Sequence, residues 1–190
     1  MRSMRKLGVL VAVFALCAIG AANASAAEFT ASATGTLTGK ALANQVFTTN
    51  GGTVTCSTAA TKGTIEKTAD TQQTVGVKYS GCTAFGFATV DISEAKYQFT
   101  ASGPVHILNT ISITPTFFGS SLCTVTVKPQ TVNTVDFANS GSNNVKVTPT
   151  VSGIVYESTG GSCGSSGANG TYTGANEVSR EGGGTVRFDP

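Results

Sequence analysis

Few residues of this chain have side chains that could carry out acid–base or nucleophilic chemistry. His106 is the single histidine, and it lies between apolar neighbours. Asp136 and Ser162 follow it in an order that some serine proteases use for their catalytic residues, but no catalytic motif surrounds them. Asp91 and Glu94 form the one tight pair of carboxylates, the residue type that glycoside hydrolysis requires. We expect a protein that is not an enzyme, and keep as an alternative a small secreted hydrolase using His106 or the Asp91/Glu94 pair.

The cysteines point to disulfide bonds and not to a metal or redox site. Four cysteines remain without Cys17, which lies in the N-terminal segment described below as an export signal. An even number of cysteines in an exported chain predicts disulfides. No Cys-x-x-Cys spacing is present to indicate a zinc or dithiol site. Three pairings are open, and similar segments in the two halves of the chain favour pairing within each half. Apart from Cys17 near the N-terminus, the cysteines are Cys56, Cys82, Cys123 and Cys163, so we expect Cys56–Cys82 and Cys123–Cys163.

One segment is rich in oxygen ligands of the kind that calcium accepts. Asp136, Asn139 and Asn143 lie close together in the sequence, but calcium normally requires more than one carboxylate. An ordinary Asx-turn loop is the simpler interpretation. The segment is therefore a weak calcium candidate, and no cofactor is expected.

The first 26 residues have the three parts of a secretory signal peptide. Basic residues at the N-terminus precede the apolar segment 7–20, and Ala24-Ser25-Ala26 supplies a small-x-small cleavage site. The apolar segment is too short to cross a bilayer, and no second apolar segment of spanning length follows. We expect cleavage after Ala26, no transmembrane anchor in the mature chain, and a secreted, extracellular or cell-envelope location.

Charge excludes one class of partner. The whole chain has a formal charge of +2, but loss of the signal peptide would leave nine basic and ten acidic residues. A nucleic-acid-binding protein needs a basic surface to neutralise phosphates. We expect no nucleic-acid partner, and an unknown extracellular or cell-surface partner instead.

Residue patterning predicts an all-β domain. The 30 threonines favour strands, and apolar residues alternate with polar ones in several segments. Turn residues recur at short intervals, and Asn50-Gly51-Gly52 marks the clearest hairpin. We expect eleven to thirteen short strands in an antiparallel β-sandwich with Greek-key or jelly-roll-like connections; a small closed β-barrel is the alternative. The alternating apolar positions include Val75, Val77, Tyr79, Tyr97, Phe99, Val125, Val127, Val145 and Val147.

Residues 27–190 are expected to form a single Thr/Gly-rich domain. Within it, residues 157–184 contain nine glycines together with many serines. We expect a Gly/Ser-rich loop here, pinned by Cys163, and a last hairpin between Glu177–Arg180 and Thr185–Phe188.

Two Phe-Gly strings, Phe85-Gly86-Phe87 and Phe117-Phe118-Gly119, each lie near a cysteine. Buried, they would be core residues beside a disulfide; exposed, they would be contact points for a partner. We favour the core.

These observations lead to a secreted, non-catalytic protein that acts as a surface, matrix or binding module of unknown ligand. Low charge and two disulfides suit a durable extracellular scaffold. The alternatives are the hydrolase described above and an extracellular carrier of a small ligand, with its pocket between the sheets.

Overall fold

The computed structural model describes residues 26–190, so the expected signal peptide lies outside the described residues except for Ala26. This part of the chain is built almost entirely of strands, and all of its strand pairs are antiparallel. The expected all-β, antiparallel class is confirmed. The strands are β1 (Glu28–Ala31), β2 (Gly35–Thr49), β3 (Gly52–Ile65), β4 (Ala69–Asp70), β5 (Gln72–Ala84), β6 (Ala88–Ile92), β7 (Ala95–Thr100), β8 (Pro104–Ile107), β9 (Ile111–Phe117), β10 (Ser120–Ser121), β11 (Thr124–Val127), β12 (Gln130–Thr134), β13 (Asp136–Ser140), β14 (Asn144–Thr148), β15 (Thr150–Thr159), β16 (Gly167–Arg180) and β17 (Val186–Asp189).

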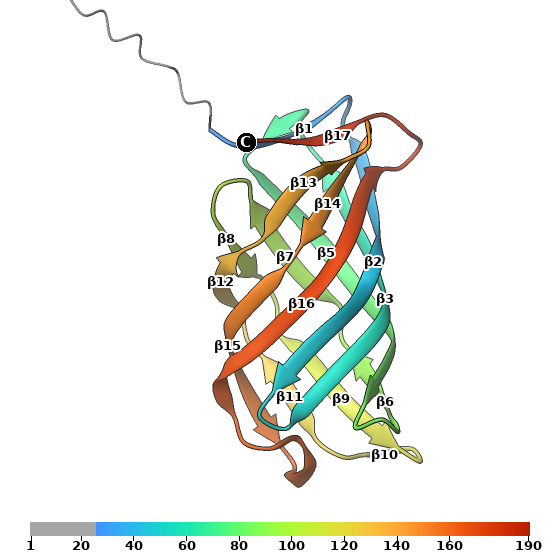
Figure 1. Cartoon of the computed structure of the whole chain (residues 1–190), viewed down its shortest axis with the longest axis vertical. Coiled ribbons are helices and arrows are strands. Elements are labelled where there is room, and N and C mark those ends of the chain that lie inside the picture. Colours follow the sequence, from blue (N-terminus) through green and yellow to red (C-terminus); the bar gives the residue numbers. More distant parts are fainter. Residues whose placement is uncertain (1–25) are drawn as a thin grey trace, which may run out of the picture.

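Four strands are much longer than expected. β2, β3, β5 and β16 have 13 to 15 residues each and cross the molecule diagonally as one wall (Figure 1). Several glycines that resemble turn signals in the sequence lie inside these strands, because neighbouring strands approach them closely. A Cβ on Gly39, for example, would lie 2.9 Å from the carbonyl oxygen of Glu177.

In the lower half of the molecule, as oriented in Figure 1, the ladder of hydrogen-bonded strands closes on itself. The hydrogen-bonded order β2–β3–β5–β6–β9–β11–β15–β16 returns to β2, which makes a ring of eight strands. β6 completes the ring, because Thr83 of β5 lies opposite Thr89 and Val90 lies opposite Pro115 of β9. This pairing has the connectivity of a small closed barrel, in which opposite walls pack across a common core.

The upper half of the wall is widened by other strands. β7, β8 and β12 extend the sheet beyond β5, while β14 and β13 extend it beyond β16. Gln130 of β12 joins the two sides with its side chain. Its Nε2 donates a hydrogen bond to the carbonyl oxygen of Val155 (2.8 Å), and its Oε1 accepts one from the amide of Val155 (2.9 Å).

A separate three-stranded sheet crosses the upper end (Figure 1). β1 pairs with β17 and with β4, so strands near the two ends of the chain lie together. The expected hairpin between 177–180 and 185–188 is therefore wrong, since β17 pairs with β1. The ring of Phe29 in β1 packs against Phe137 of β13 at 5.0 Å between centroids, which fixes this sheet on the barrel. Within the sheet, Phe29 also packs against Phe188 of β17 at 5.9 Å.

The expected loop over 157–184 is also wrong for most of its length. Residues 160–166 and 181–184 are the parts of this segment that leave the ladder, and the first of them contains a short 3-10 turn, Gly161–Cys163. The glycines of β16 provide space for neighbours. Gly170 lies against the backbone of Ile154, and Gly174 lies against the side chain of Gln45. A glycine-rich composition here reflects close packing and not a flexible connection.

Candidate functional site

The interior of the barrel contains a cavity of about 120 Å³ with an almost entirely apolar wall. It extends from the cap strands at the upper end to Phe47 and Ile113, which also line a second cavity of about 20 Å³ nearer the lower end. Half of the residues that line this cavity are valine or isoleucine. Among them are Val75, Val77, Val127, Val145 and Val147, all of which the alternation pattern predicted to share buried faces.

A cluster of polar side chains lies in this apolar wall. The hydroxyl of Tyr79 donates a hydrogen bond to the hydroxyl of Tyr172 (3.3 Å), and Tyr172 donates to Oε1 of Gln45. The hydroxyls of Tyr97 and Tyr79 are 3.0 Å apart. Because Tyr79 uses its proton on Tyr172, Tyr97 must donate to Tyr79. The three phenolic protons therefore form one directed chain that ends on Gln45.

Irregularities in two strands place Gln45 in the interior. The register between β2 and β3 shifts between Gly39 and Gln45, and β16 shifts on both sides of Ala175. Such bulges redirect side chains. Gln45 is fully buried, and its Nε2 donates to the carbonyl oxygens of Ala43 (2.8 Å) and Ala175 (3.2 Å). Gly174 leaves the space that the amide occupies, because a Cβ there would overlap Oε1.

Asn176 gives the cluster an unused acceptor. Its Nδ2 donates to Oε1 of Gln45 (3.3 Å), but its Oδ1 is buried without a hydrogen-bond partner. The residue is only 9 % exposed and it lines the cavity. Buried acceptors in folded proteins are normally paired, so the cavity wall presents one polar position that a bound molecule can satisfy.

Burial shifts the acidity of the three phenols. Removal from water raises the pKa of Tyr79 well above its usual value, and the neighbouring phenols Tyr172 and Tyr97 add to the rise. Desolvation also raises the pKa of Tyr97, and it raises the pKa of Tyr172 to about 12. The phenols thus stay neutral at physiological pH and act as hydrogen-bonding groups.

The residues considered for catalysis lie apart from this cavity. His106 lies on β8 opposite Thr131 of β12, and its Nδ1 is 2.9 Å from the Thr131 hydroxyl. Glu94 forms an ion pair with Lys78 (3.7 Å), and Asp91 lies opposite Thr114 on the β6–β9 ladder. None of these groups lines either of the two cavities.

The calcium candidates are not brought together as a ligand set. Asp136 and Asn139 lie on one extended strand, β13, which separates them by about 10 Å at 3.3 Å per residue. Asn139 instead binds backbone: its Nδ2 donates to the carbonyl oxygen of Phe188 and its Oδ1 accepts from the Phe188 amide, both at 2.9 Å. Asn143 lies in the turn before β14. Within residues 26–190 no group of three or more His, Cys, Asp or Glu side chains could hold a metal ion.

The cysteines form the two disulfides that the sequence favoured. Cys56 and Cys82 lie directly opposite each other on β3 and β5, and Cys123 is joined to Cys163 at the end of the 3-10 turn. The second bond lies in the lower end of the barrel. A Cβ on Gly51 would overlap the carbonyl oxygen of Cys163, so the disulfide-bonded loop packs directly on the β2–β3 turn. Two such pairs point to an oxidising environment.

The Phe-Gly strings are exposed, so the expectation of a core position is wrong. They form the turns β5–β6 and β9–β10, and the residues that face inward beside the first turn are the small Ala84 and Ala88. Phe87 and Phe118 project beyond the ladder, whereas Phe85 lies against Gly52 and lines the smaller cavity. The four exposed phenylalanines are Phe85, Phe87, Phe117 and Phe118.

Sequence reasoning missed the amides of the site. Tyr79 and Tyr97 were placed with the correct apolar faces, but nothing in the sequence marks Gln45 and Asn176 as buried. Their burial depends on bulges in β2 and β16, whose positions are set by pairing between distant segments. A signal was available in Gly174, two residues before Asn176, because a glycine within a strand often marks a close approach.

No family model matches the chain, and the comparisons with curated proteins and with solved structures give no match. Over the described residues, no helix has the length and apolar character needed to cross a bilayer. The function is therefore argued from the cavity and its polar cluster.

Proposed function

We propose that this protein is an exported, non-catalytic binding module that encloses a small apolar molecule carrying a hydrogen-bond donor. The observation that carries the proposal is the unpaired Oδ1 of Asn176 in the wall of a predominantly apolar cavity. An unpaired acceptor in this wall makes the cavity less favourable for a purely apolar ligand. It favours a ligand that has a hydroxyl or N–H group to donate to it.

The dimensions of the barrel agree with one small ligand. Eight-stranded barrels either fill their interior with side chains or hold a single small molecule. Apolar cavities of about 150 Å³ in other proteins stay dry and bind molecules of the size of benzene. The 120 Å³ cavity is of this order, so a ligand with a single ring or a short chain fits it.

Three features support export. Residues 1–26 have the pattern of a cleaved signal peptide. β1 begins at Glu28, so only Ala27 separates it from the proposed cleavage site after Ala26. The two disulfides require an oxidising compartment to form and persist. The protein is therefore proposed to work outside the cell or in the cell envelope, where its partner is a small molecule or a surface.

The hydrolase alternative is less well supported, because His106 and the Asp91/Glu94 pair do not line the cavity. A surface or matrix module remains the second candidate. It is favoured by the exposed phenylalanines and by the uncharged lower end of the barrel, which are considered below.

Binding of two matched probes tests the proposal. Toluene and 4-methylphenol have the same shape apart from the hydroxyl, which can donate to Asn176. We expect both to bind, with 4-methylphenol about five- to ten-fold tighter, the value of one net hydrogen bond. Affinities are measured by ligand-observed nuclear magnetic resonance and by isothermal titration calorimetry on the exported protein.

Two variants assign the site. Asn176→Leu removes the acceptor and keeps a side chain of similar volume, so it should abolish the preference for 4-methylphenol. Val147 lies opposite Asn176 on the β14–β16 ladder and lines the cavity, so Val147→Phe should exclude both probes. Failure of the wild type to bind either probe would contradict the proposal, as would a preference that survives in Asn176→Leu.

A further inference from the structure

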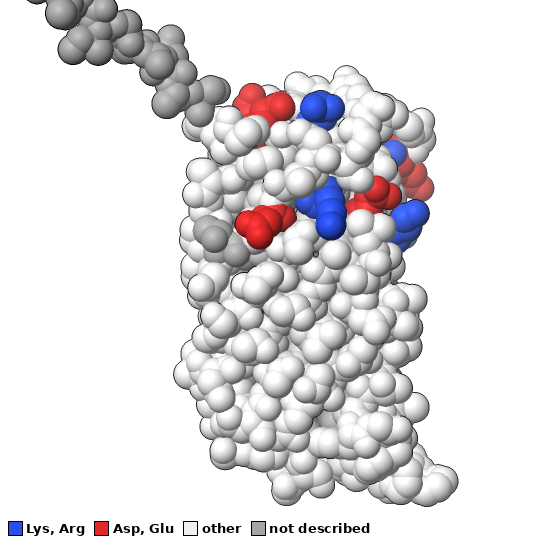
Figure 2. All heavy atoms as spheres, viewed as in Figure 1, with Lys and Arg blue, Asp and Glu red and all other residues white. Residues whose placement is uncertain are grey.

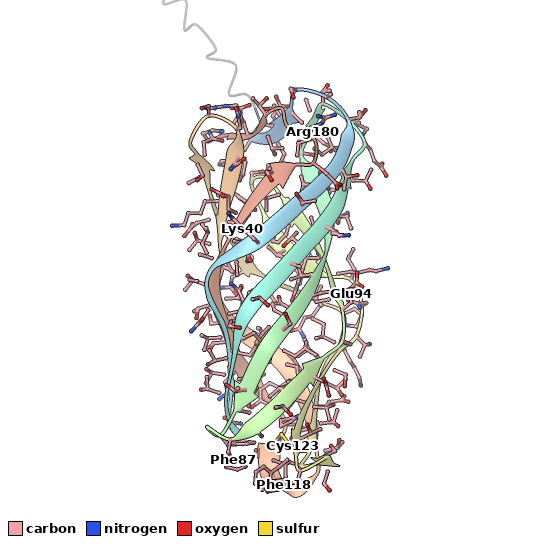
Figure 3. The ribbon with its side chains drawn as sticks, turned by 90° about the vertical axis from the view of Figure 1, so that its right-hand side faces the viewer. Lys40, Phe87, Glu94, Phe118, Cys123 and Arg180 are labelled. Atoms are coloured by element: carbon pink, nitrogen blue, oxygen red, sulfur yellow. A yellow bond between two sulfur atoms is a disulfide. The ribbon has the colours of Figure 1, made fainter. Side chains whose placement is uncertain are left out.

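Four phenylalanine rings form an exposed aromatic tip at the lower end of the barrel. The tip consists of Phe85 and Phe87 from the β5–β6 turn, Phe117 at the end of β9 and Phe118 from the β9–β10 turn. Phe118 is 93 % exposed and Phe87 is 59 % exposed. The rings touch across the two turns, with centroids 4.8 Å apart for Phe87 and Phe117. Figure 3 shows Phe87 and Phe118 at the extreme of the long axis, beside Cys123.

Each of the two turns holds one phenylalanine in the left-handed backbone region. Phe85 has φ of 55° and Phe118 has φ of 48°, each followed by a glycine with positive φ. This left-handed conformation costs energy for a bulky residue, and Asn or Gly normally occupies the position in a two-residue hairpin. Strain of this kind is typical of functional positions. Added Cβ atoms on Gly86 and Gly119 would meet nothing within 4 Å, so the turns are open to their surroundings.

The end of the barrel that carries the tip has no charged side chain in its turns. Residues 41–61, 79–90 and 158–176 contain no Asp, Glu, Lys or Arg, and residues 97–127 contain none either. These segments supply the β2–β3, β5–β6 and β9–β10 turns and the loop after β15. In the view of Figure 2, the charged side chains of the visible face lie near the opposite end of the molecule.

We propose that the aromatic tip inserts into the interfacial region of a lipid bilayer with zwitterionic headgroups. A convex group of rings on uncharged turns enters this region without removing charge from water. Amphipathic or apolar residues at the headgroup level are a common means of reversible attachment. The absence of Lys and Arg at the tip means that anionic lipid contributes no attraction, in contrast to attachment by polybasic segments.

The shape and polarity of the tip favour a bilayer over a protein partner. A stable protein interface combines apolar contact with directional polar and charged groups around it, whereas the rim here consists of glycine, serine and threonine turns. A fluid bilayer needs no complementary groove, and it accommodates projecting rings of any arrangement. A second copy of this chain is the competing occupant, and the test below distinguishes it.

Flotation with vesicles of pure phosphatidylcholine tests the proposal on the exported protein. We expect the wild type to float with the vesicles, and Phe87→Ser combined with Phe118→Ser to reduce the partition coefficient about ten-fold or more, since each ring loses its burial in the interface. The matched control is Leu42→Ser combined with Val155→Ser. These residues are 48 % and 54 % exposed, lie on β2 and β15, and should leave binding unchanged.

Further measurements decide between the occupants. Circular dichroism of both variants verifies that the fold is retained, and Phe118→Leu, which keeps an apolar side chain, should bind more tightly than the double serine variant. Adding phosphatidylserine or salt should change binding less than two-fold. The proposal is overturned if the wild type does not float, if it requires anionic lipid, or if the double variant binds as well as the control. Dimerisation in sedimentation velocity that the tip variant abolishes, without any vesicle binding, would assign the surface to a second copy.

Discussion

The hydroxyl of Tyr172 donates a hydrogen bond to Oε1 of Gln45, although 127 positions separate the two residues in the chain. The bond connects the neighbouring strands β16 and β2. It is the last of the series of hydrogen bonds donated by phenols that begins at Tyr97. Because Gln45 is fully buried, its amide is fixed by the protein and not by water. This fixed polar cluster is what distinguishes the cavity from an ordinary packing defect.

The neutral phenols predict a loss of stability in alkali. An unfolded tyrosine has a pKa near 10, while burial raises the folded value for Tyr172 to about 12 and raises those of Tyr79 and Tyr97 as well. Below pH 10 both states keep the phenolic protons, so the free energy of unfolding is unaffected. Above pH 10 the unfolded state releases protons first, and stability falls as the pH rises through the folded values.

Spectrophotometric titration of a Tyr156→Phe variant checks this prediction, because the remaining tyrosines all belong to the cluster. Tyrosinate absorbance should appear well above pH 10 and together with loss of near-ultraviolet circular dichroism. Ionisation at pH 10 with the tertiary signal intact would show that the cluster is open to water.

Gly174→Ala should displace the Gln45 amide. The new Cβ would overlap Oε1 of Gln45, whose position is fixed by four hydrogen bonds. Overpacking of this kind costs about 1–3 kcal/mol, which chemical denaturation measures. Gly161→Ala is the control, since its Cβ meets nothing within 4 Å and its φ is not in the left-handed region. Equal stability of the two variants would mean that Gln45 is not held as described.

Removing either disulfide should destabilise the barrel by about 2–5 kcal/mol. The paired variants Cys56→Ala with Cys82→Ala and Cys123→Ala with Cys163→Ala avoid free thiols, and thermal or denaturant unfolding compares them with the wild type. The bonds close 26 and 40 residue separations. Unchanged stability in either variant would show that the crosslink adds nothing to the ladder it spans. A linkage of Cys56 to Cys123 or Cys163 in unreduced peptide maps would contradict the pairing itself.

Local patterns predicted the parts of the fold that depend on local information. Alternation assigned Val75, Val77 and Tyr79 to one buried face, and Asn50-Gly51-Gly52 marked the β2–β3 hairpin. The all-β class follows from these signals, because period-two patterning and turn residues are properties of neighbouring positions.

The features that the sequence did not reveal depend on contacts between distant segments. Gly174 reads as a loop residue until Gln45 is known to fill its space. The sequence predicts a core position for Phe118 because the residue is apolar. Its exposure depends on the backbone of a turn that lies beyond the ladder, which the local pattern does not show. The unpaired Asn176 acceptor likewise results from the register of β16 with β2 and β14.

A crystal structure of the exported protein with 4-methylphenol tests the central claim most directly. The proposal predicts the ring inside the cavity, among the apolar residues of the wall, with the phenol oxygen within hydrogen-bond distance of Asn176 Oδ1. The same crystals of Asn176→Leu should show the ring without a fixed orientation. An empty cavity with the phenol on the outer surface, or a phenol oxygen directed away from Asn176, would contradict the account.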